Sequence, residues 1–172
     1  MRPIELKIKG INSYREEQVI NFNQLTSQGF FGIFGPTGSG KSTILDAITL
    51  ALYAKLPRGS KNFININETS ASVSFHFSIT TTETKEYLVE RSFRYPGKDR
   101  SSTARNTTAR LSLLSDIDTE VLADKPTDVT RSCIDLLGLS SDDFLRTVVL
   151  PQGQFSDFLK LKNQERRGML QR

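Results

Sequence analysis

The sequence has 172 residues, a net charge of +4 and 37% hydrophobic residues. This length fits one domain, the hydrophobic content argues against disorder, and no apolar run reaches the roughly 20 residues of a membrane span. A single cysteine, Cys133, excludes an internal disulfide and a cysteine-rich metal cluster. We therefore expect a cytoplasmic protein without membrane contact, and the mild positive charge permits an acidic polymer as partner without requiring one.

The first part of the chain is predicted to form three strands. Residues 3–9, PIELKIK, place Ile4, Leu6 and Ile8 on one face, and a second strand follows in QVINF after the polar turn NSYREEQ. FFGIF, residues 30–34, is a short apolar run typical of a buried strand.

A helix is predicted from Lys41 to about Ala54, with Pro57 and Gly59 beyond its end. Its expected apolar face comprises Ile44, Leu45, Ile48 and Leu52. From Ala71 the apolar period changes from 3.6 to 2, because Val73, Phe75, Phe77 and Ile79 alternate with small or polar residues. His76 alternates with Phe75 and Phe77, which assigns it to the outer face and gives no support for a ligand or base.

Three further segments, EYLVERSF, ARLSLLSD and TEVLAD, continue the alternation as an antiparallel meander. We therefore predict an α/β fold with a mixed central sheet, an antiparallel β meander and flanking helices. Between two of the strands lies PGKDRSSTARNTTAR, residues 96–110, which lacks large apolar residues and is predicted to be a mobile loop.

This loop carries an excess of positive charge, and two interpretations of it are open. Its charged residues are Lys98, Asp99, Arg100, Arg105 and Arg110. Such a loop is usually a solvated hairpin tip, and the alternative is phosphate contact with duplex DNA.

The last third is predicted to begin with a helix from Pro126 to about Leu137, in which Cys133 is a buried apolar side chain. A short helix around residues 140–145 follows, capped by Ser140 or Ser141. RTVVLPQ, residues 146–152, is predicted to be a strand, and the tail from Phe155 to be helical and charged.

Residues 35–42, GPTGSGKS, match the phosphate-loop pattern G-x-x-x-x-G-K-[ST]. Glycines let backbone N–H groups converge on phosphate oxygens, and the following helix directs its positive dipole end at the same anion. Lys41 is predicted to reach the β and γ phosphates, Ser42 to ligate Mg²⁺, and Thr43 to approach the α phosphate. The candidate nucleotide-binding residues are Gly35, Pro36, Thr37, Gly38, Ser39, Gly40, Lys41, Ser42 and Thr43. No Asn-Lys-x-Asp run for guanine recognition is present, so ATP with Mg²⁺ is the predicted ligand.

A phosphate-loop enzyme also needs an acidic residue after an apolar strand, which holds Mg²⁺ or orients the attacking water. The nearest imitation is Asp116 at the end of LSLLSD, but Ile117 follows it and the strand belongs to the meander. We reject Asp116 as a catalytic acid, and adenylate-kinase-like and helicase-like functions are weakened for the same reason.

Two sequence blocks resemble one family. FGPTGSGKSTILDAITLALY, with NSY in an earlier turn, resembles the SMC-like branch of ABC-type ATPases. Further along, DDFLRTVVLPQGQFSDFLKLKNQERRGML resembles the Q-loop region of SbcC, the ATPase subunit of a bacterial double-strand-break repair nuclease.

The resemblance implies an ATPase head built from the two ends of a long chain joined by an antiparallel coiled coil. Residues 1–162 would form the N-terminal half of this ABC-type head, and residues 163–172 the root of the coiled coil. The C-terminal half of the same polypeptide would supply the catalytic acid, the signature motif and the switch histidine. Further implied partners are a second head in an ATP-sandwich dimer, an SbcD-type nuclease subunit and double-stranded DNA. The fragment alone is expected to be inactive as an ATPase.

The resemblance also assigns residues by their position in the motifs. Lys41, Ser42 and Thr43 correspond to nucleotide-binding positions, and Gln152 corresponds to the Q-loop glutamine that contacts Mg²⁺ and the attacking water; Gln154 is the weaker candidate. Lys41 and Gln152 are therefore the candidate catalytic residues, and Ser42 and Gln152 the candidate metal ligands. Relatives carry a phosphate-contacting arginine in the first turn where this sequence has Asn12, and Arg15 is a weak substitute for it.

Three other functions fit parts of the pattern. A transporter nucleotide-binding subunit normally has its Q-loop much closer to the phosphate loop. A chromosome or recombination ATPase of the SMC type is closer, although QGQFSDFL favours SbcC. The third is a non-catalytic DNA-binding module that holds ATP structurally, and a gene that continues into heptads and a second half-head would exclude it.

Overall fold

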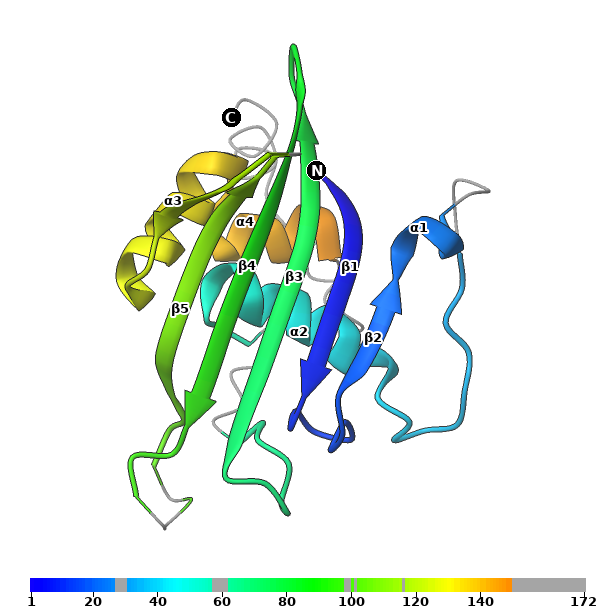
Figure 1. Ribbon diagram of the computed structural model, residues 1–172. Helices are drawn as coiled ribbons and strands as arrows, with labels where there is room; N and C mark the ends of the chain where they lie inside the picture. Colours follow the sequence, from blue (N-terminus) through cyan, green and yellow to red (C-terminus); the bar gives the residue numbers. More distant parts are fainter. Residues whose placement is uncertain (27–30, 57–61, 98–99, 101, 116, 150–172) are drawn as a thin grey trace, which may run out of the picture.

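The computed structural model describes residues 1–26, 31–56, 62–97, 100, 102–115 and 117–149 (Figure 1). These residues form a six-stranded sheet in the order β2-β1-β3-β4-β5-β6. The strands are β1 (Arg2–Lys9), β2 (Gln18–Asn21), β3 (Ser70–Thr80), β4 (Thr84–Arg94), β5 (Arg105–Leu114) and β6 (Thr119–Ala123). The helices are α1 (Phe22–Leu25), α2 (Lys41–Tyr53), α3 (Pro126–Leu137) and α4 (Ser141–Phe144), followed by the π-helical turn η1 (Leu145–Val149).

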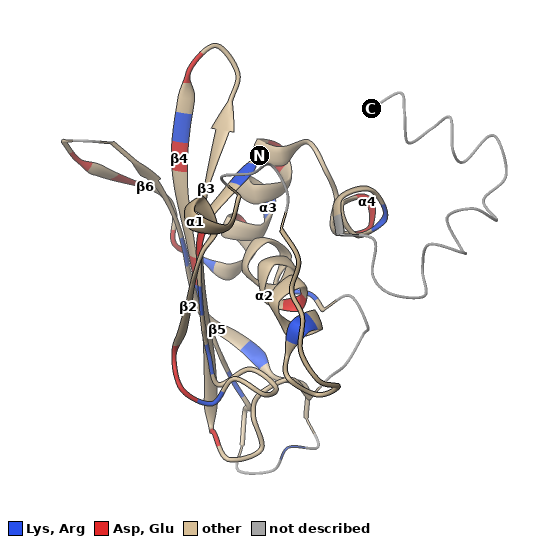
Figure 2. Ribbon diagram, turned by 90° about the vertical axis from the view of Figure 1, so that its right-hand side faces the viewer, with Lys and Arg blue, Asp and Glu red and all other residues tan. Residues whose placement is uncertain are grey.

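The sheet and the helices form two layers. Figure 2 shows the sheet edge-on, with α2 and α3 against one of its faces. Val73, Phe75 and Phe77 of β3 are buried on this side, which confirms the alternation predicted from Ala71 onwards. The meander β3-β4-β5-β6 is antiparallel, also as predicted.

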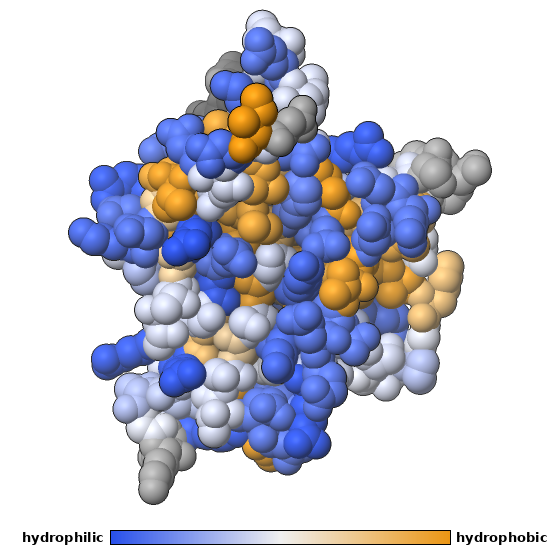
Figure 3. Space-filling view, in the orientation of Figure 1, coloured by the Kyte–Doolittle hydropathy of each residue, from blue (hydrophilic) through white to orange (hydrophobic). Residues whose placement is uncertain are grey.

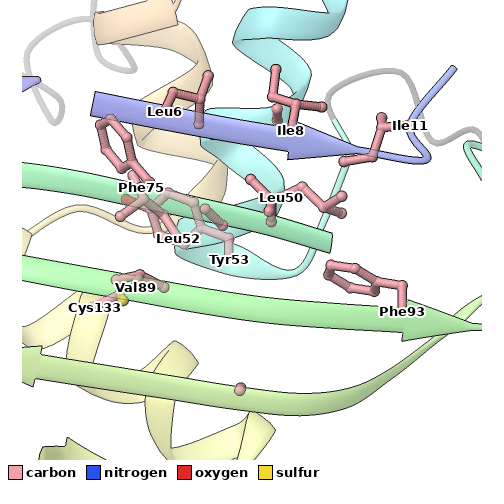
Figure 4. Packing of buried hydrophobic residues seen from close by; sticks show 14 of the residues in the cluster. Leu6, Ile8, Ile11, Leu50, Leu52, Tyr53, Phe75, Val89, Phe93 and Cys133 are labelled. Atoms are coloured by element: carbon pink, nitrogen blue, oxygen red, sulfur yellow. The ribbon is translucent and has the colours of Figure 1, made fainter. Parts of the chain in front are cut away.

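The hydrophobic core lies between the sheet and α2 (Figure 4). Leu6 and Ile8 of β1 and Val89 of β4 are fully buried, and so is Leu52 of α2. Burying one side chain of this size stabilises the fold by roughly 1.5–3 kcal/mol. The core therefore holds α2 firmly against the sheet, and with it the end of the phosphate loop.

The opposite face of the sheet is open and mostly hydrophilic (Figure 3). His76 lies on this face, as predicted, and its Nε2 atom is 2.8 Å from Oε2 of Glu86 on β4. The same face carries a shallow hollow whose lining includes Ser72, Ser74, Glu90, Ser92, Thr108 and Arg110. Among the described residues, none of the helices combines the length and apolarity that crossing a bilayer takes.

The expected mixed sheet is wrong for the described residues, since every strand pair in it is antiparallel. The FFGIF strand is also wrong over residues 31–34, which belong to neither helix nor strand, and Phe34 is 93% exposed. A strand requires a neighbour for its backbone N–H and C=O groups. The described part of the chain offers no such neighbour to this segment, so its apolar composition alone does not make it a strand.

The predicted strand RTVVLPQ is wrong where the structure describes it, because Leu145–Val149 form η1. The chain continues helically from α4, and the Thr147 hydroxyl donates to the carbonyl of Asp143 at 2.7 Å. Local hydrogen bonds to the preceding turn thus override the strand preference of β-branched residues.

Two smaller predictions need correction. The predicted loop of residues 96–110 ends earlier than expected, because β5 begins at Arg105 and places both Arg105 and Arg110 within a strand. Leu45, expected on the apolar face of α2, is 40% exposed. The buried side of the helix passes instead through Ile44, Ala47 and Ala51, which is the spacing of a 3.6-residue period.

The two C-terminal helices agree with the prediction. Pro126 is the first residue of α3, and Ser140 caps α4 through a hydrogen bond that its side chain accepts from the backbone N–H of Asp143.

Candidate nucleotide-binding site

The phosphate loop lies where the sequence predicts it, directly before α2. Residues 35–40 form no helix or strand, and the 13-residue helix α2 begins at Lys41. The N-cap residue Gly40 has a left-handed φ of 93° and makes no side-chain capping bond. The first N–H groups of α2 therefore face an exposed loop, as expected at an anion-binding helix end.

Lys41 folds back over this loop. Its Nζ atom donates to the carbonyl oxygens of Gly35 and Pro36 at 2.7 and 2.6 Å and lies 3.5 Å from Oγ of Ser39. Anionic phosphate oxygens bind an ammonium group more strongly than neutral carbonyl oxygens do. The position of this ammonium thus fits a phosphate ligand that takes the place of the two carbonyls.

The two hydroxyls that follow Lys41 lie in different surroundings. Ser42 is exposed, so its hydroxyl is accessible to a metal ion bound beside the loop. Thr43 is only 5% exposed, and its Oγ1 atom is 3.4 Å from Nδ2 of Asn12. The α-phosphate contact assigned to Thr43 would have to form at a hydroxyl that Asn12 already contacts.

The turn between β1 and β2 lies directly against the phosphate loop. Asn12 adopts a left-handed φ of 47°, which asparagine tolerates better than most residues. The Ser13 hydroxyl donates to the carbonyl of Gly38 at 2.8 Å, and the ring of Tyr14 lies against Gly40. This turn therefore supports the loop through its own side chains.

Arg15, the weak substitute for the arginine of relatives, makes a different contact. Its Nε atom donates to Oε1 of Glu68 at 2.9 Å, and this hydrogen bond raises the pKa of the exposed guanidinium. Arg15 is thus ion-paired with the segment that precedes β3.

Arg91 is a buried cation at the other end of α2. It occupies an inward position of β4 and is 2% exposed. Its guanidinium donates to the carbonyls of Ala51 and Leu52 at 2.5 and 3.1 Å and to the Thr130 hydroxyl at 3.0 Å. Burial lowers the pKa of Arg91. The bonds join the last turn of α2 to α3, and a positive charge near a helix C-terminus is favourable.

Tyr53 provides a second connection from α2. Its hydroxyl donates to the carbonyl of Leu139 at 3.1 Å, and its ring centroid lies 5.4 Å from that of Phe144.

Burial raises the pKa of the neighbouring Cys133 thiol to about 11, with Arg91 acting in the opposite direction. Cys133 is fully buried, which confirms its predicted structural role.

The basic loop is organised differently from the prediction. Arg100 donates to four backbone carbonyls, and Arg105 and Arg110 lie on β5. Lys98 and Asp99 lie outside the described residues. The donors of Arg100 are thus directed at the protein itself.

Gln152 and Gln154, which were predicted to belong to a Q-loop, lie outside the described residues. The structure therefore brings together Lys41, Ser42 and Thr43 with the glycine-rich loop. It adds Asn12, Ser13 and Tyr14, which the sequence analysis did not assign to the site. Position in an alternating strand could have flagged Arg91, since it follows Tyr87 and Val89 at the same period, but nothing in the sequence indicated its carbonyl partners.

Comparisons with known proteins identify the family and several relatives of this chain. A family model described as AAA domain matches residues 5–172. The SbcC subunit of the nuclease SbcCD from Clostridium acetobutylicum is 53% identical over 172 residues, and that from Bacillus subtilis is 51% identical over 175 residues. Both alignments cover 100% of this chain, but the chain spans only 15% of the length of these relatives. A probable DNA double-strand break repair Rad50 ATPase of Aquifex aeolicus is 34% identical over 175 residues, which cover 99% of this chain and 16% of that protein.

The fold also has a solved counterpart. A structure from work on the ATP-driven dimerization and DNA-stimulated activation of SMC ATPases has a TM-score of 0.64. It is 22% identical, and the alignment covers 99% of this chain and 98% of that one. The likeness at this identity concerns the fold alone, and it supports the predicted α/β lobe.

Proposed function

Because the chain belongs to the AAA domain family and resembles SbcC over its whole length, we propose that it is the ATP-binding lobe of an SbcC-type ATPase subunit. In this proposal residues 1–162 form the N-terminal half of the head and residues 163–172 begin the coiled coil. The chain is more than 50% identical to two SbcC subunits of SbcCD nucleases, and this identity favours the proposed function over a chromosome ATPase of the SMC type.

The observation that carries the proposal is the position of Lys41. Its ammonium lies over the loop at the start of α2, held by carbonyl oxygens that a phosphate can replace. A helix N-terminus, a glycine-rich backbone and a lysine in this arrangement bind the β and γ phosphates of a nucleotide.

Mg²⁺ is the metal that we assign to the same site. The exposed hydroxyl of Ser42 suits this ion, which prefers oxygen ligands, and Gln152 is proposed as the second protein ligand. Bound there, Mg²⁺ would neutralise charge that develops on the phosphates. The residues of this chain bind and orient the nucleotide, and Gln152 is proposed to orient the attacking water.

The partners are proposed from the length of the relatives and from the chemistry of the lobe. The chain spans 15% of its SbcC relatives, so the C-terminal half of the same polypeptide can supply the catalytic acid. A second head, an SbcD-type nuclease and double-stranded DNA complete the proposal, in which ATP-driven head dimerisation controls the processing of DNA ends. On this view residues 1–172 alone do not hydrolyse ATP.

Exposed apolar side chains beside the phosphate loop support the proposal that another part of the head packs against this surface. Phe31, Ile33 and Phe34 are all exposed there. Large apolar groups gathered at the surface are typical of an interface.

The proposal is tested with Lys41→Ala in the full-length protein. We expect loss of ATP hydrolysis and a marked loss of ATP affinity, because the cation that faces the phosphates is removed while the fold is kept. Lys55→Ala is the matched control. Lys55 lies beyond the other end of α2, where it pairs with Asp142 at 2.7 Å, so its loss should leave both properties unchanged. Phosphate release and fluorescent-ATP titration measure the outcome, and a folded Lys41→Ala protein with normal turnover contradicts the proposal.

A further inference from the structure

Arg100 lies in a hairpin loop, but its guanidinium N–H groups donate to backbone carbonyls of the protein itself. Nη1 donates to the carbonyls of Ile64 and Asn65 at 3.4 and 3.1 Å, and Nη2 donates to those of Ile66 and Glu68 at 2.6 and 2.7 Å. The guanidinium also lies 5.6 Å from the centroid of the Tyr95 ring. Only a planar fork of several N–H groups can hold four carbonyls in this way, and a lysine ammonium cannot.

The segment that Arg100 holds is itself bound to the turn between β1 and β2. The backbone N–H of Asn65 donates to the carbonyl of Gly10 at 2.8 Å, and that of Asn12 donates to the carbonyl of Phe63 at 2.7 Å. Nδ2 of Asn65 donates to the carbonyl of Asn12 at 2.6 Å. Asn12 is thus fixed on both sides of its left-handed backbone.

The turn then contacts the phosphate loop at two places and the first turn of α2 at a third. Asn12 reaches Oγ1 of Thr43, Ser13 donates to the carbonyl of Gly38, and the Tyr14 ring lies against Gly40. A displacement of Asn12 would therefore be felt in the second half of the phosphate loop and in the first turn of α2.

We propose that Arg100 is a positioning residue for the nucleotide site, which acts in series through the segment 64–68 and Asn65 on Asn12 and so on the phosphate loop. The proposal rests on the proposed function of this loop as the ATP site. It makes Arg100, in the loop between β4 and β5, a structural support of that site in place of a contact with duplex DNA.

Single and double substitutions along this series of contacts test the proposal. In the full-length protein, Arg100→Ala and Asn65→Ala each break one link, and we expect each to raise KM for ATP roughly tenfold, the effect of about one lost hydrogen bond, with kcat unchanged. Because the links act in series, the double variant should raise KM no further than the larger single change. Arg100→Lys keeps the charge but loses the fork, so it should follow Arg100→Ala.

Arg105→Ala is the matched control, since it removes the same charge from the exposed start of β5 in the same hairpin. Its KM for ATP should equal that of the wild type. DNA binding is measured in parallel as a salt series, and Arg100→Ala should leave the slope unchanged.

Three results would overturn the inference. One is an Arg100→Ala KM equal to that of Arg105→Ala, and another is KM increases that multiply in the double variant. The third is an unchanged KM with a DNA salt slope shallower by about one unit, which identifies Arg100 as a phosphate contact on DNA. A wild-type protein that binds no ATP would refute the proposed function instead, so the two failures are distinguishable.

Discussion

The ring of Tyr14 lies so close to Gly40 that no side chain can stand between them. A Cβ atom at Gly40 would lie 2.8 Å from Cε2 and 3.0 Å from Cζ of Tyr14, and Gly40 also has a left-handed φ of 93°. The turn between β1 and β2 and the end of the phosphate loop can therefore approach each other only with glycine at position 40.

We expect Gly40→Ala to lower the free energy of unfolding by more than Gly38→Ala does. Gly38 has a similar φ of 85° but open space around its Cα, so alanine there meets backbone strain of about 1 kcal/mol alone. Urea unfolding of both variants measures the difference. Tyr14→Ala in the Gly40→Ala background should recover part of the loss, and equal effects at the two glycines would contradict the close contact.

Arg91→Ala should lower the free energy of unfolding by about 3 kcal/mol. It leaves the buried carbonyls of Ala51 and Leu52 without the charged donor that now satisfies them, and such bonds contribute about 1.5–3 kcal/mol each. Arg94→Ala, an exposed change on the same strand, should stay within about 0.5 kcal/mol of the wild type. Chemical denaturation of both variants measures the free energy of unfolding. A similar small loss of this free energy in each would show that Arg91 is dispensable.

Alkaline pH should destabilise the protein through Cys133. The pKa of this thiol is raised to about 11 in the folded state from an ordinary value of 9.0, so between these values the folded state binds more protons than the unfolded state. Stability from this group is complete below pH 9 and is lost as the pH rises towards 11. Urea unfolding at pH 8 and pH 10.5 should show a steeper loss for the wild type than for Cys133→Ala. Parallel losses would mean that the Cys133 thiol does not titrate as described.

Gln152→Ala should slow ATP hydrolysis and ATP-dependent head closure far more than it weakens ATP binding. A glutamine at this point can offer its carbonyl oxygen to Mg²⁺ and its amide to water or phosphate. Gln154→Ala is the control and should do much less. Single-turnover hydrolysis and equilibrium ATP titration of both variants separate chemistry from binding, and a greater sensitivity of Gln154 would place the motif two residues further along.

Features set by near neighbours in the chain could be predicted from the sequence. The loop of residues 35–40, the start of α2 and the alternation of β3 depend on glycine conformation, helix period and strand period. Pro126 at the start of α3 and Ser140 at the cap of α4 belong to the same class, because their effects reach only the following turn.

Features that depend on distant partners were decided only by the tertiary structure. Residues 31–34 have the composition of a strand but pair with none among the described residues, because strand formation needs a neighbour that composition does not reveal. Arg100 was assigned to a loop and Arg91 was not singled out, and packing supplied their carbonyl partners from 32 to 40 positions away in the sequence. The sequence determines which residues are cations. Whether a cation contacts solvent, a ligand or the protein's own backbone depends on which segments folding brings within hydrogen-bonding distance.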